Sequence, residues 1–307
     1  MPTPLAPPRS GRLTVAVASG KGGTGKTLVA TNLTLAAARA GAPVALVDCD
    51  ADAPNDALFV TPPTSDTAPV EVPLPVIDDG ACVPCGACRE ACAYGAIRIL
   101  GGRVMVFPEL CHGCGACVRA CTPGAISESL RRVGEVVWGR VAHGIGEPGG
   151  VDVVSGRLDV GEVKTPSVIR AARKRAAVLA RSVTILDAPP GVACSTVAAV
   201  RDADVLVLVT EPTPFGLHDL GLALTLAREM ALSTGVVINR DGAGGADIGA
   251  YCARDGIPVL ARIPFDRRIA EIYAEGGLMI DAHPDGAAWF GALWKSVLAL
   301  AAEAEVR

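Results

Sequence analysis

Residues 13–27 read LTVAVASGKGGTGKT, a short apolar run that leads directly into a glycine-rich loop. The apolar run is typical of a buried β-strand, and the segment 27–40 after the loop has helical periodicity. Residues 20–27 therefore carry the pattern G-x4-G-K-S/T in the context that it needs, between a strand and a helix. Backbone N–H groups of such a loop surround phosphate oxygens, and the helix N-terminus adds a favourable dipole. The stretch predicts a site for the phosphates of a nucleotide.

Individual residues of this loop have expected roles. Lys26 is expected to reach the β- and γ-phosphates, and the Thr27 hydroxyl is expected to bind Mg²⁺. The rest of the loop is expected to line the phosphates with its backbone: Gly20, Gly22, Gly23, Thr24 and Gly25. A purely structural glycine turn is the alternative interpretation, which the strand-to-helix context disfavours.

Short apolar strands alternate with helical segments along the rest of the chain. This alternation predicts an α/β fold with a mostly parallel sheet and helices on both faces. The expected strands are 44–48, 133–141, 151–158, 183–187, 204–210, 235–239 and about 258–263. The expected helices are 168–181, about 193–201, 216–232, 246–255 and 286–305. The proline-rich stretch from about residue 54 to residue 75 is predicted to be a linker.

Two cysteine runs interrupt this alternation, CVPCGACREAC at 82–92 and CHGCGACVRAC at 111–121. Each has the spacing C-x2-C-x2-C-x3-C, which is the ligand pattern of a bacterial ferredoxin with two [4Fe–4S] clusters. The segments 82–97 and 111–126 match at ten of sixteen positions, which predicts two cluster-binding loops related by pseudo-twofold symmetry. In this pattern the fourth cysteine of each run binds the other cluster. The predicted ligand sets are Cys82, Cys85, Cys88 and Cys121 for one cluster, and Cys92, Cys111, Cys114 and Cys117 for the other.

Zinc knuckles are the alternative interpretation of the cysteine runs, but zinc sites do not usually need four cysteines in each run. The proline that usually follows the fourth cysteine is absent after Cys92 and comes one position late after Cys121. His112 is expected to be a solvated loop residue. The cysteines outside the runs are expected to be core thiols: Cys49, Cys194 and Cys252.

Composition and charge narrow the classes of function. A net charge of −4 over 307 residues gives no basic field, so nucleic-acid binding is not expected. No run of 18 uncharged apolar residues is present, so no membrane span is expected. Metal-type cysteine spacing without an N-terminal apolar signal predicts a reducing, cytoplasmic location. Residues 1–12 are rich in proline and are predicted to be a disordered tail.

Lys21 places a second lysine at the start of the phosphate loop and gives it the form K-G-G-x-G-K-T. With this signature the sequence resembles the MinD/ParA/Mrp group of P-loop ATPases, of the SIMIBI class, which includes the nitrogenase iron protein. It resembles more closely the MinD-superfamily ATPases that carry an inserted ferredoxin domain, and the resemblance covers nearly the whole chain after residue 12. In that group the extra lysine crosses an ATP-sandwich homodimer to the partner's nucleotide, which implies this role for Lys21.

The resemblance also implies roles for polar residues at the ends of the expected strands. Asp50 corresponds to the carboxylate that orients the attacking water, with Asp52 as a competitor for that role. Asp187 corresponds to the Walker B position, which holds the Mg²⁺ shell through water. Asn239 and Arg240 correspond to the pair that contacts adenine. The implied catalytic residues are Lys21, Lys26, Asp50 and Asp187, and the implied Mg²⁺ residues are Thr27, Asp50 and Asp187.

These expectations combine into one domain organisation and one leading function. A discontinuous P-loop ATPase domain is expected at 13–67 and 132–307, with an inserted ferredoxin domain at 68–131. The leading hypothesis is an ATPase that gates electron transfer through two [4Fe–4S] clusters, with ATP and Mg²⁺, to an unknown redox partner. An iron–sulfur cluster carrier is the second hypothesis, and complete ligand sets within one chain disfavour it.

A positioning or partition ATPase is the third hypothesis. Its membrane-bound versions use a basic amphipathic C-terminal helix, and the segment 289–307 lacks that basic character. Its DNA-binding versions need a basic patch. One expected helix does carry a cluster of basic residues, which is interpreted as a solvated face: Arg170, Arg173, Lys174, Arg175 and Arg181.

Overall fold

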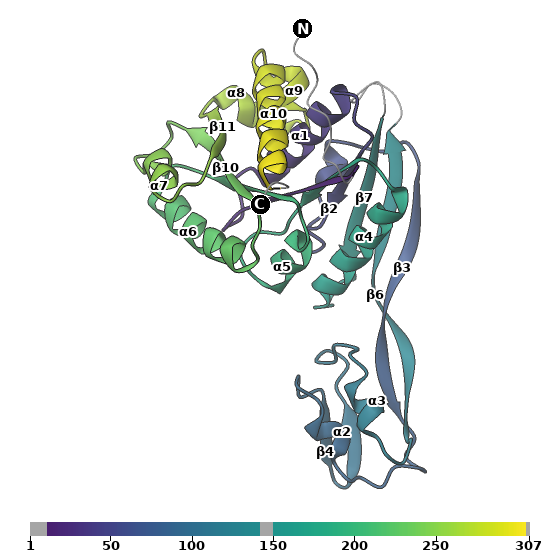
Figure 1. Ribbon diagram of the computed structural model, residues 1–307. Helices are drawn as coiled ribbons and strands as arrows, with labels where there is room; N and C mark the ends of the chain where they lie inside the picture. The colour runs from purple at the N-terminus through teal and green to yellow at the C-terminus, as the bar shows by residue number, and fades with distance from the viewer. Residues whose placement is uncertain (1–10, 142–149, 305–307) are drawn as a thin grey trace.

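The computed structural model describes residues 11–141 and 150–304. They form a large α/β body from which a small cysteine-rich module projects on a two-stranded ribbon (Figure 1). Most of the predicted N-terminal tail, residues 1–10, lies outside the described residues.

A nine-stranded sheet runs through the body in the order β11-β10-β9-β1-β8-β2-β7-β6-β3. The neighbours from β11 to β7 pair in parallel, whereas β6 and β3 pair antiparallel at one end. The prediction of an α/β fold with a mostly parallel sheet is therefore confirmed. The parallel strands are β1 (Leu13–Ala18), β2 (Val44–Asp48), β7 (Val151–Leu158), β8 (Val183–Asp187), β9 (Val205–Thr210), β10 (Thr234–Asp241) and β11 (Val259–Pro264).

Helices cover both faces of this sheet because its central strands are apolar on both sides. In β1, Val15 and Val17 contribute to one core, and Ala16 and Ala18 contribute to the other. The first core lies under α1 (Lys26–Arg39), α8 (Arg267–Ala274), α9 (Met279–Ala282) and α10 (Gly286–Ala304). The second lies under α4 (Thr165–Leu179), α5 (Cys194–Val200), α6 (Pro214–Glu229) and α7 (Ile248–Arg254).

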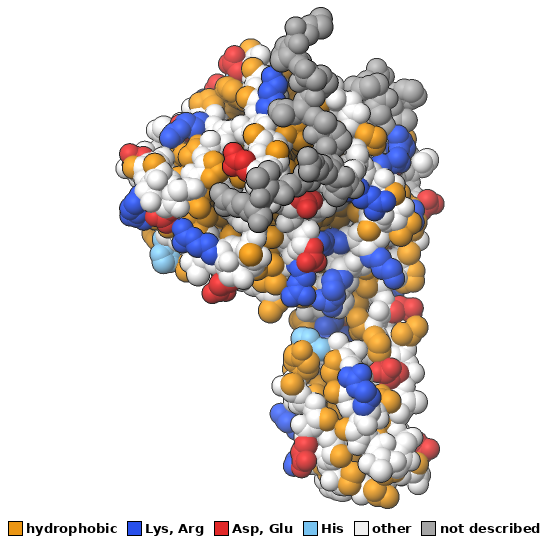
Figure 2. Space-filling model, in the orientation of Figure 1, with side chains coloured by type: hydrophobic (Ala, Val, Ile, Leu, Met, Phe, Trp, Pro, Cys, Tyr) orange, Lys and Arg blue, Asp and Glu red, His pale blue; other side chains and the backbone are white. Residues whose placement is uncertain are grey.

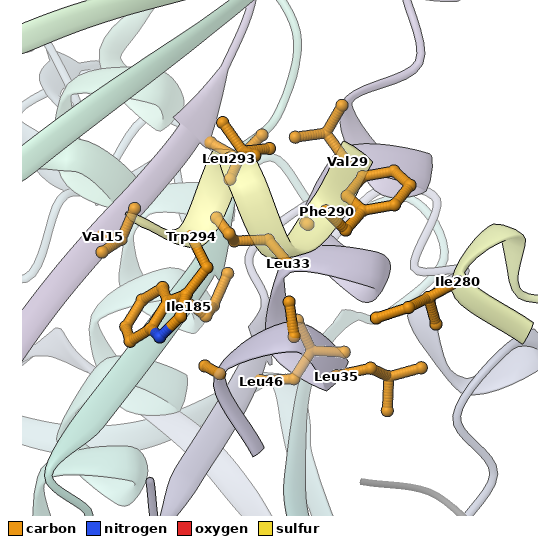
Figure 3. Close-up of a cluster of buried hydrophobic side chains, with 14 of the residues drawn as sticks. Val15, Val29, Leu33, Leu35, Leu46, Ile185, Ile280, Phe290, Leu293 and Trp294 are labelled. Carbon is orange, nitrogen blue, oxygen red and sulfur yellow. The ribbon is translucent and has the colours of Figure 1, made fainter. Parts of the chain in front are cut away.

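Aliphatic side chains dominate the first core, and a few aromatic rings from the C-terminal helix complete it. Leu33 of α1 lies beside Phe290, Leu293 and Trp294 of α10 (Figure 3). Phe290 and Leu293 are almost completely buried. This packing fixes α1, and with it the phosphate loop that leads into the helix.

The proline-rich stretch contains a strand, so the prediction of a linker from about residue 54 to residue 75 is wrong. β3 (Ser65–Ile77) pairs along its length with β6 (Ile126–Val141). A strand at the edge of a sheet tolerates proline wherever the missing N–H would face outward. Pro69, Pro73 and Pro75 are separated by even numbers of residues, so all three fall on the same side of this edge strand. A short 3₁₀ helix, η1 (Asp56–Leu58), precedes the strand.

The cysteine-rich module lies at the carboxyl edge of the parallel sheet. β6 pairs with β7 only from Gly134 onward, where Gly134 lies opposite Leu158 at the end of β7. The earlier part of β6 therefore extends beyond that edge together with β3, across the predicted domain boundaries at 68 and 131. The module contains α2 (Ala87–Glu90), α3 (Ala116–Ala120) and a hairpin of β4 (Ile97–Leu100) with β5 (Arg103–Val106).

Candidate functional site

The phosphate loop connects β1 to α1, and its glycines are required by its backbone. Gly23 and Gly25 have φ values of 77° and 95°, in the left-handed region that favours glycine. A Cβ atom on Gly20 would lie 2.2 Å from the carbonyl oxygen of Asp219. The side chain of Lys26 is buried and makes no hydrogen bond or ion pair within the described part of the chain. The loop therefore presents one uncommitted ammonium group and the N-terminus of a long helix.

Thr27 and Asp187 come together at the end of β8. The Thr27 hydroxyl donates to Asp187 Oδ2 at 2.6 Å, and it also lies 3.1 Å from Asn55 Oδ1. Burial raises the pKa of Asp187 to about 6, although the Thr27 hydroxyl and the Lys26 ammonium act in the opposite direction. The structure thus joins two of the three residues that were predicted to serve Mg²⁺.

Asp48 organises the turn that follows β2. It lies opposite Asp187 in the β2–β8 ladder. Its carboxylate accepts from the backbone N–H groups of Asn55 at 2.7 Å, Asp56 at 3.0 Å and Asp50 at 3.1 Å. Burial, and then the neighbouring Asp187 carboxylate, raise the pKa of Asp48 to about 7. Asp48 is therefore a structural anchor for the segment that carries Asp50.

Asp56 is a buried carboxylate that sequence reasoning missed. It is 0% exposed, and among the described residues no N–H or hydroxyl group donates to its oxygens. Asp56 and Asp187 can share a hydrogen bond only when one of the two carboxyls is protonated. Burial, and then Asp48 and Asp187, raise its pKa well above the ordinary value. Asp187 Oδ1 is also buried without a partner. Unpaired buried carboxylate oxygens are costly, and a cation would offset that cost. These orphaned oxygens beside Thr27 fit a Mg²⁺ ion that also binds nucleotide phosphates and water.

Asp50 and Asp52 face different neighbours, which separates the two competitors for the water-orienting role. Asp50 is half-buried; burial raises its pKa, and the Lys26 ammonium opposes that effect. Asp52 is exposed, and its two carboxylate oxygens each lie 3.3 Å from the Thr165 hydroxyl at the start of α4. The Asp50 carboxylate therefore interacts electrostatically with Lys26 of the phosphate loop, whereas the Asp52 carboxylate contacts the start of α4.

Lys21 is engaged within its own chain. Its ammonium lies 2.5 Å from Glu211 Oε1, and Arg240 lies 3.0 Å from the other oxygen of the same carboxylate. Burial tends to raise the pKa of Glu211, but Lys21 and Arg240 outweigh it and lower the pKa. Sequence reasoning missed Glu211, although its place directly after β9, at the carboxyl edge of the sheet, could have indicated it.

Asn239 lies against the phosphate loop, and both ends of its amide are engaged. Its Nδ2 donates to the Thr24 carbonyl oxygen at 2.7 Å, and its Oδ1 accepts from the Arg240 backbone N–H at 3.0 Å. The predicted contact of Asn239 and Arg240 with adenine is not visible in these interactions and stays a prediction. What the structure establishes is that Asn239 braces the loop at Gly25, where a Cβ atom would collide with its Nδ2.

The cysteines of the two runs gather around two pockets, and each pocket takes one cysteine from the opposite run. The first is lined by Cys82, Cys85, Cys88 and Cys121, and the second by Cys92, Cys111, Cys114 and Cys117. Ile97, Val104 and Ile126 form the small apolar core between them. After burial, the neighbouring Cys121 and Cys85 thiols are the main groups that raise the pKa of Cys82.

The donor set of each pocket suits an iron–sulfur cluster. Four thiols are the usual ligands of a [4Fe–4S] cluster, and backbone N–H groups commonly tune it by donating to sulfur. The N–H of Ala96 donates to Cys92 Sγ at 3.3 Å, and that of Gly113 to Cys111 Sγ at 3.4 Å. No three His, Cys, Asp or Glu side chains in residues 11–141 and 150–304 are arranged around a single metal ion. The type of ligand and the grouping of the cysteines therefore fit two iron–sulfur clusters.

One expectation about the remaining cysteines was wrong, and the expectation about His112 was not. Cys194, predicted to be a core thiol, is exposed at the first residue of α5, whereas Cys49 and Cys252 are buried. His112 is exposed as predicted, and its ring stacks on Tyr94 with centroids 3.7 Å apart.

The basic residues of α4 are only partly a solvated face. Arg173 donates to the carbonyl oxygens of Ala198 and Arg201, Arg175 lies 3.9 Å over the Trp138 ring, and Arg181 pairs with Asp152. Arg173 and Arg175 brace α4 against its surroundings, and Arg181 lies just beyond the end of the helix. Arg170 and Lys174 are exposed. Basic side chains also gather where the body faces the module (Figure 2).

The described helices include none that combines the length and the apolar character needed to cross a membrane.

The chain is similar to known proteins over most of its length. Residues 15–279 match the family model described as the CobQ/CobB/MinD/ParA nucleotide binding domain. Two uncharacterised proteins of Methanocaldococcus jannaschii are similar to the chain. One is 31% identical over 88% of this chain and 90% of its own length, and the other is 28% identical over 85% and 89%.

Solved structures share the fold. The cell division ATPase MinD of Pyrococcus furiosus is 22% identical, with a TM-score of 0.57 over 94% of this chain and 99% of its own. MinD of Pyrococcus horikoshii, complexed with Mg-ADP, is 22% identical, with a TM-score of 0.55 over 95% and 98%. A ParA family ATPase of Chlorobium tepidum is 16% identical, with a TM-score of 0.54 over 95% and 98%.

Proposed function

Because the chain belongs to the CobQ/CobB/MinD/ParA nucleotide-binding family, we propose that it binds and hydrolyses ATP with Mg²⁺, and that this cycle gates electron transfer through two [4Fe–4S] clusters to a partner protein. The observation that carries the proposal is the gathering of eight cysteines into two sets of four, at the same edge of the sheet as the phosphate loop. The complex of a structurally similar MinD with Mg-ADP supports the choice of nucleotide and metal.

The residues of the phosphate site divide the work of ATP hydrolysis. The uncommitted Lys26 ammonium binds the β- and γ-phosphates, and Thr27 and Asp187 hold Mg²⁺. Asp50, anchored through Asp48, orients the attacking water. Lys21 leaves Glu211 and stabilises the charge of the transferring phosphoryl group of a second subunit, so the active form is a homodimer.

The cysteine sets would hold the clusters in fixed places within one chain. Cys82, Cys85, Cys88 and Cys121 hold one, and the other four cysteines hold the second. Each cluster supplies one-electron redox chemistry, at a potential of roughly −400 mV if it behaves as in a low-potential ferredoxin. Cys88 and Cys117 are buried in the apolar core of the module, whereas Cys85 and Cys114 are exposed.

Anaerobic purification followed by iron analysis, EPR and an ATPase assay tests this function. The proposal predicts EPR signals of two clusters that stay with the protein through many ATP turnovers. Transfer of the iron to an added apo-acceptor during turnover would favour the cluster-carrier hypothesis instead. Protein that hydrolyses ATP but contains zinc in place of iron would refute the redox function.

A further inference from the structure

A buried lysine connects the body to the second cysteine run. Lys164 precedes the first residue of α4 and is 5% exposed. Its ammonium donates to the Glu109 carbonyl oxygen at 2.9 Å. The Glu109 backbone belongs to a turn closed by the Cys111 N–H, which donates to Pro108 O at 3.2 Å. The lysine therefore holds the turn that ends at Cys111.

The ammonium of Lys164 lies at the turn that ends at Cys111, because it donates to the carbonyl oxygen two residues before that cysteine. A cation so placed in a low-dielectric environment favours negative charge at nearby sulfur atoms. It therefore favours the reduced form of a cluster held there, because reduction adds one negative charge.

The next residue in the chain contacts the nucleotide side. The Thr165 hydroxyl lies 3.3 Å from both carboxylate oxygens of Asp52. Asp52 belongs to the turn whose N–H groups at Asp50, Asn55 and Asp56 are held by Asp48. In P-loop switches, segments near the γ-phosphate change their arrangement when that phosphate is bound or lost. Thr165 is therefore attached to the turn that carries Asp50, beside the phosphate loop.

We propose that Lys164 and Thr165 are positioning residues that transmit the nucleotide state to the second cysteine set. Thr165 follows Asp52, and the adjoining Lys164 carries its ammonium toward or away from Cys111. The set formed by Cys92, Cys111, Cys114 and Cys117 is thus the one that senses the nucleotide, whereas the other set does not. This inference rests on the proposed function, and it adds which cluster responds and through which contact.

Redox titration of both clusters in anaerobic full-length protein tests whether the charge of Lys164 sets the potential of one cluster. Lys164→Gln retains a donor for Glu109 but removes the charge. We expect the equilibrium constant for reduction of one cluster to fall tenfold. For a one-electron couple this makes its midpoint potential about 59 mV more negative. Lys164→Arg should retain the wild-type potential. Lys174→Gln, which removes an exposed lysine from the following helix, α4, should shift neither cluster. Unchanged potentials in Lys164→Gln, with iron content intact, would overturn the assignment.

Thr165→Val tests the link to the nucleotide, with Thr165→Ser as the matched control that keeps the hydroxyl. We expect ATP to change the potential of one cluster in wild type and in Thr165→Ser, and to have no effect in Thr165→Val. A full ATP response in Thr165→Val would overturn the link while leaving gating itself intact. An absent ATP response in wild type would instead refute the proposed function, and the Lys164→Gln result would still stand on its own.

Discussion

Lys21 Nζ lies 2.5 Å from Glu211 Oε1, so the lysine proposed to serve a second subunit is bound within its own chain. The Glu211 carboxylate is 12% exposed and is also contacted by Arg240 at 3.0 Å. In the proposed sandwich dimer Lys21 leaves this partner to reach the second nucleotide. The ion pair is therefore a contact that opposes the proposed dimer.

Removing that contact should strengthen the ATP-dependent dimer. In Glu211→Gln the ammonium loses its charged partner, and an ion pair of this partly exposed kind is worth about 1 kcal/mol, or roughly a fivefold change in an equilibrium constant. Sedimentation velocity with ATP should show a correspondingly tighter dimer. Glu229→Gln, at an exposed position on α6, is the control and should leave association unchanged. A weaker dimer in Glu211→Gln would contradict this role.

Lys21→Ala should abolish turnover without disturbing the cysteine module. A cation that stabilises the transferring phosphoryl group is worth about 10³-fold or more in rate. We therefore expect ATP hydrolysis to fall by at least that order, while iron content and cluster EPR stay at wild-type levels. Lys174→Ala is the matched control. Undiminished hydrolysis in Lys21→Ala would count against the sandwich dimer.

The buried carboxylates make stability depend on pH and on Mg²⁺. Burial raises the pKa of Asp48 to about 7 and that of Asp187 to about 6, above the value near 4 of an unfolded aspartate. The folded state therefore binds these protons more tightly. Their contribution to stability is complete below about pH 4 and is lost as the pH rises through about 7. The melting temperature without nucleotide should fall across this range, and Mg²⁺–ATP should reverse the fall.

Asp56→Asn tests the origin of that pH dependence. Removing one of the clustered carboxylates should raise the free energy of unfolding at about pH 8 by on the order of 1 kcal/mol, since each pKa unit corresponds to about 1.4 kcal/mol. Mg²⁺–ATP should then stabilise the variant less than it stabilises wild type. Asp66→Asn, an exposed position on β3, should show neither effect. Equal Mg²⁺–ATP stabilisation in Asp56→Asn would exclude Asp56 from the cation site.

Exchange of the fourth cysteines gives a distinctive mutational pattern. Cys88→Ser and Cys121→Ser come from different runs but line the same pocket, so both should lose about half of the iron and leave the same EPR signal. Cys117→Ser should leave the other signal. Cys194→Ser, at the exposed start of α5, should retain all the iron. If Cys121→Ser resembled Cys117→Ser, the runs would not exchange ligands.

The sequence predicted those parts of the structure that depend on local pattern. The phosphate loop has a fixed spacing, and the alternation of strands and helices indicated the parallel sheet. The expected helix at 286–305 agrees with α10 to within one residue. The grouping of the cysteines into two crossed sets followed from the ligand pattern of two-cluster ferredoxins, whereas their ligation stays a prediction.

Other features depend on neighbours that are distant in sequence. The linker prediction failed because the prolines of β3 are acceptable only at a sheet edge, which a local pattern does not reveal. Glu211, Asp56 and Lys164 were missed because each acquires its role from a partner on another element. Lys21 pairs with a residue 190 positions away, and Lys164 with one 55 positions away.

Control of the two proposed clusters by the bound nucleotide can be measured directly. The most direct measurement is the midpoint potential of each cluster, with EPR as the monitored signal. It is made on anaerobically purified protein with and without Mg²⁺–ATP. We expect ATP to shift the potential of the cluster held by Cys92, Cys111, Cys114 and Cys117 and to leave that of the other cluster unchanged. Identical potentials with and without ATP, in protein that still hydrolyses ATP, would contradict it.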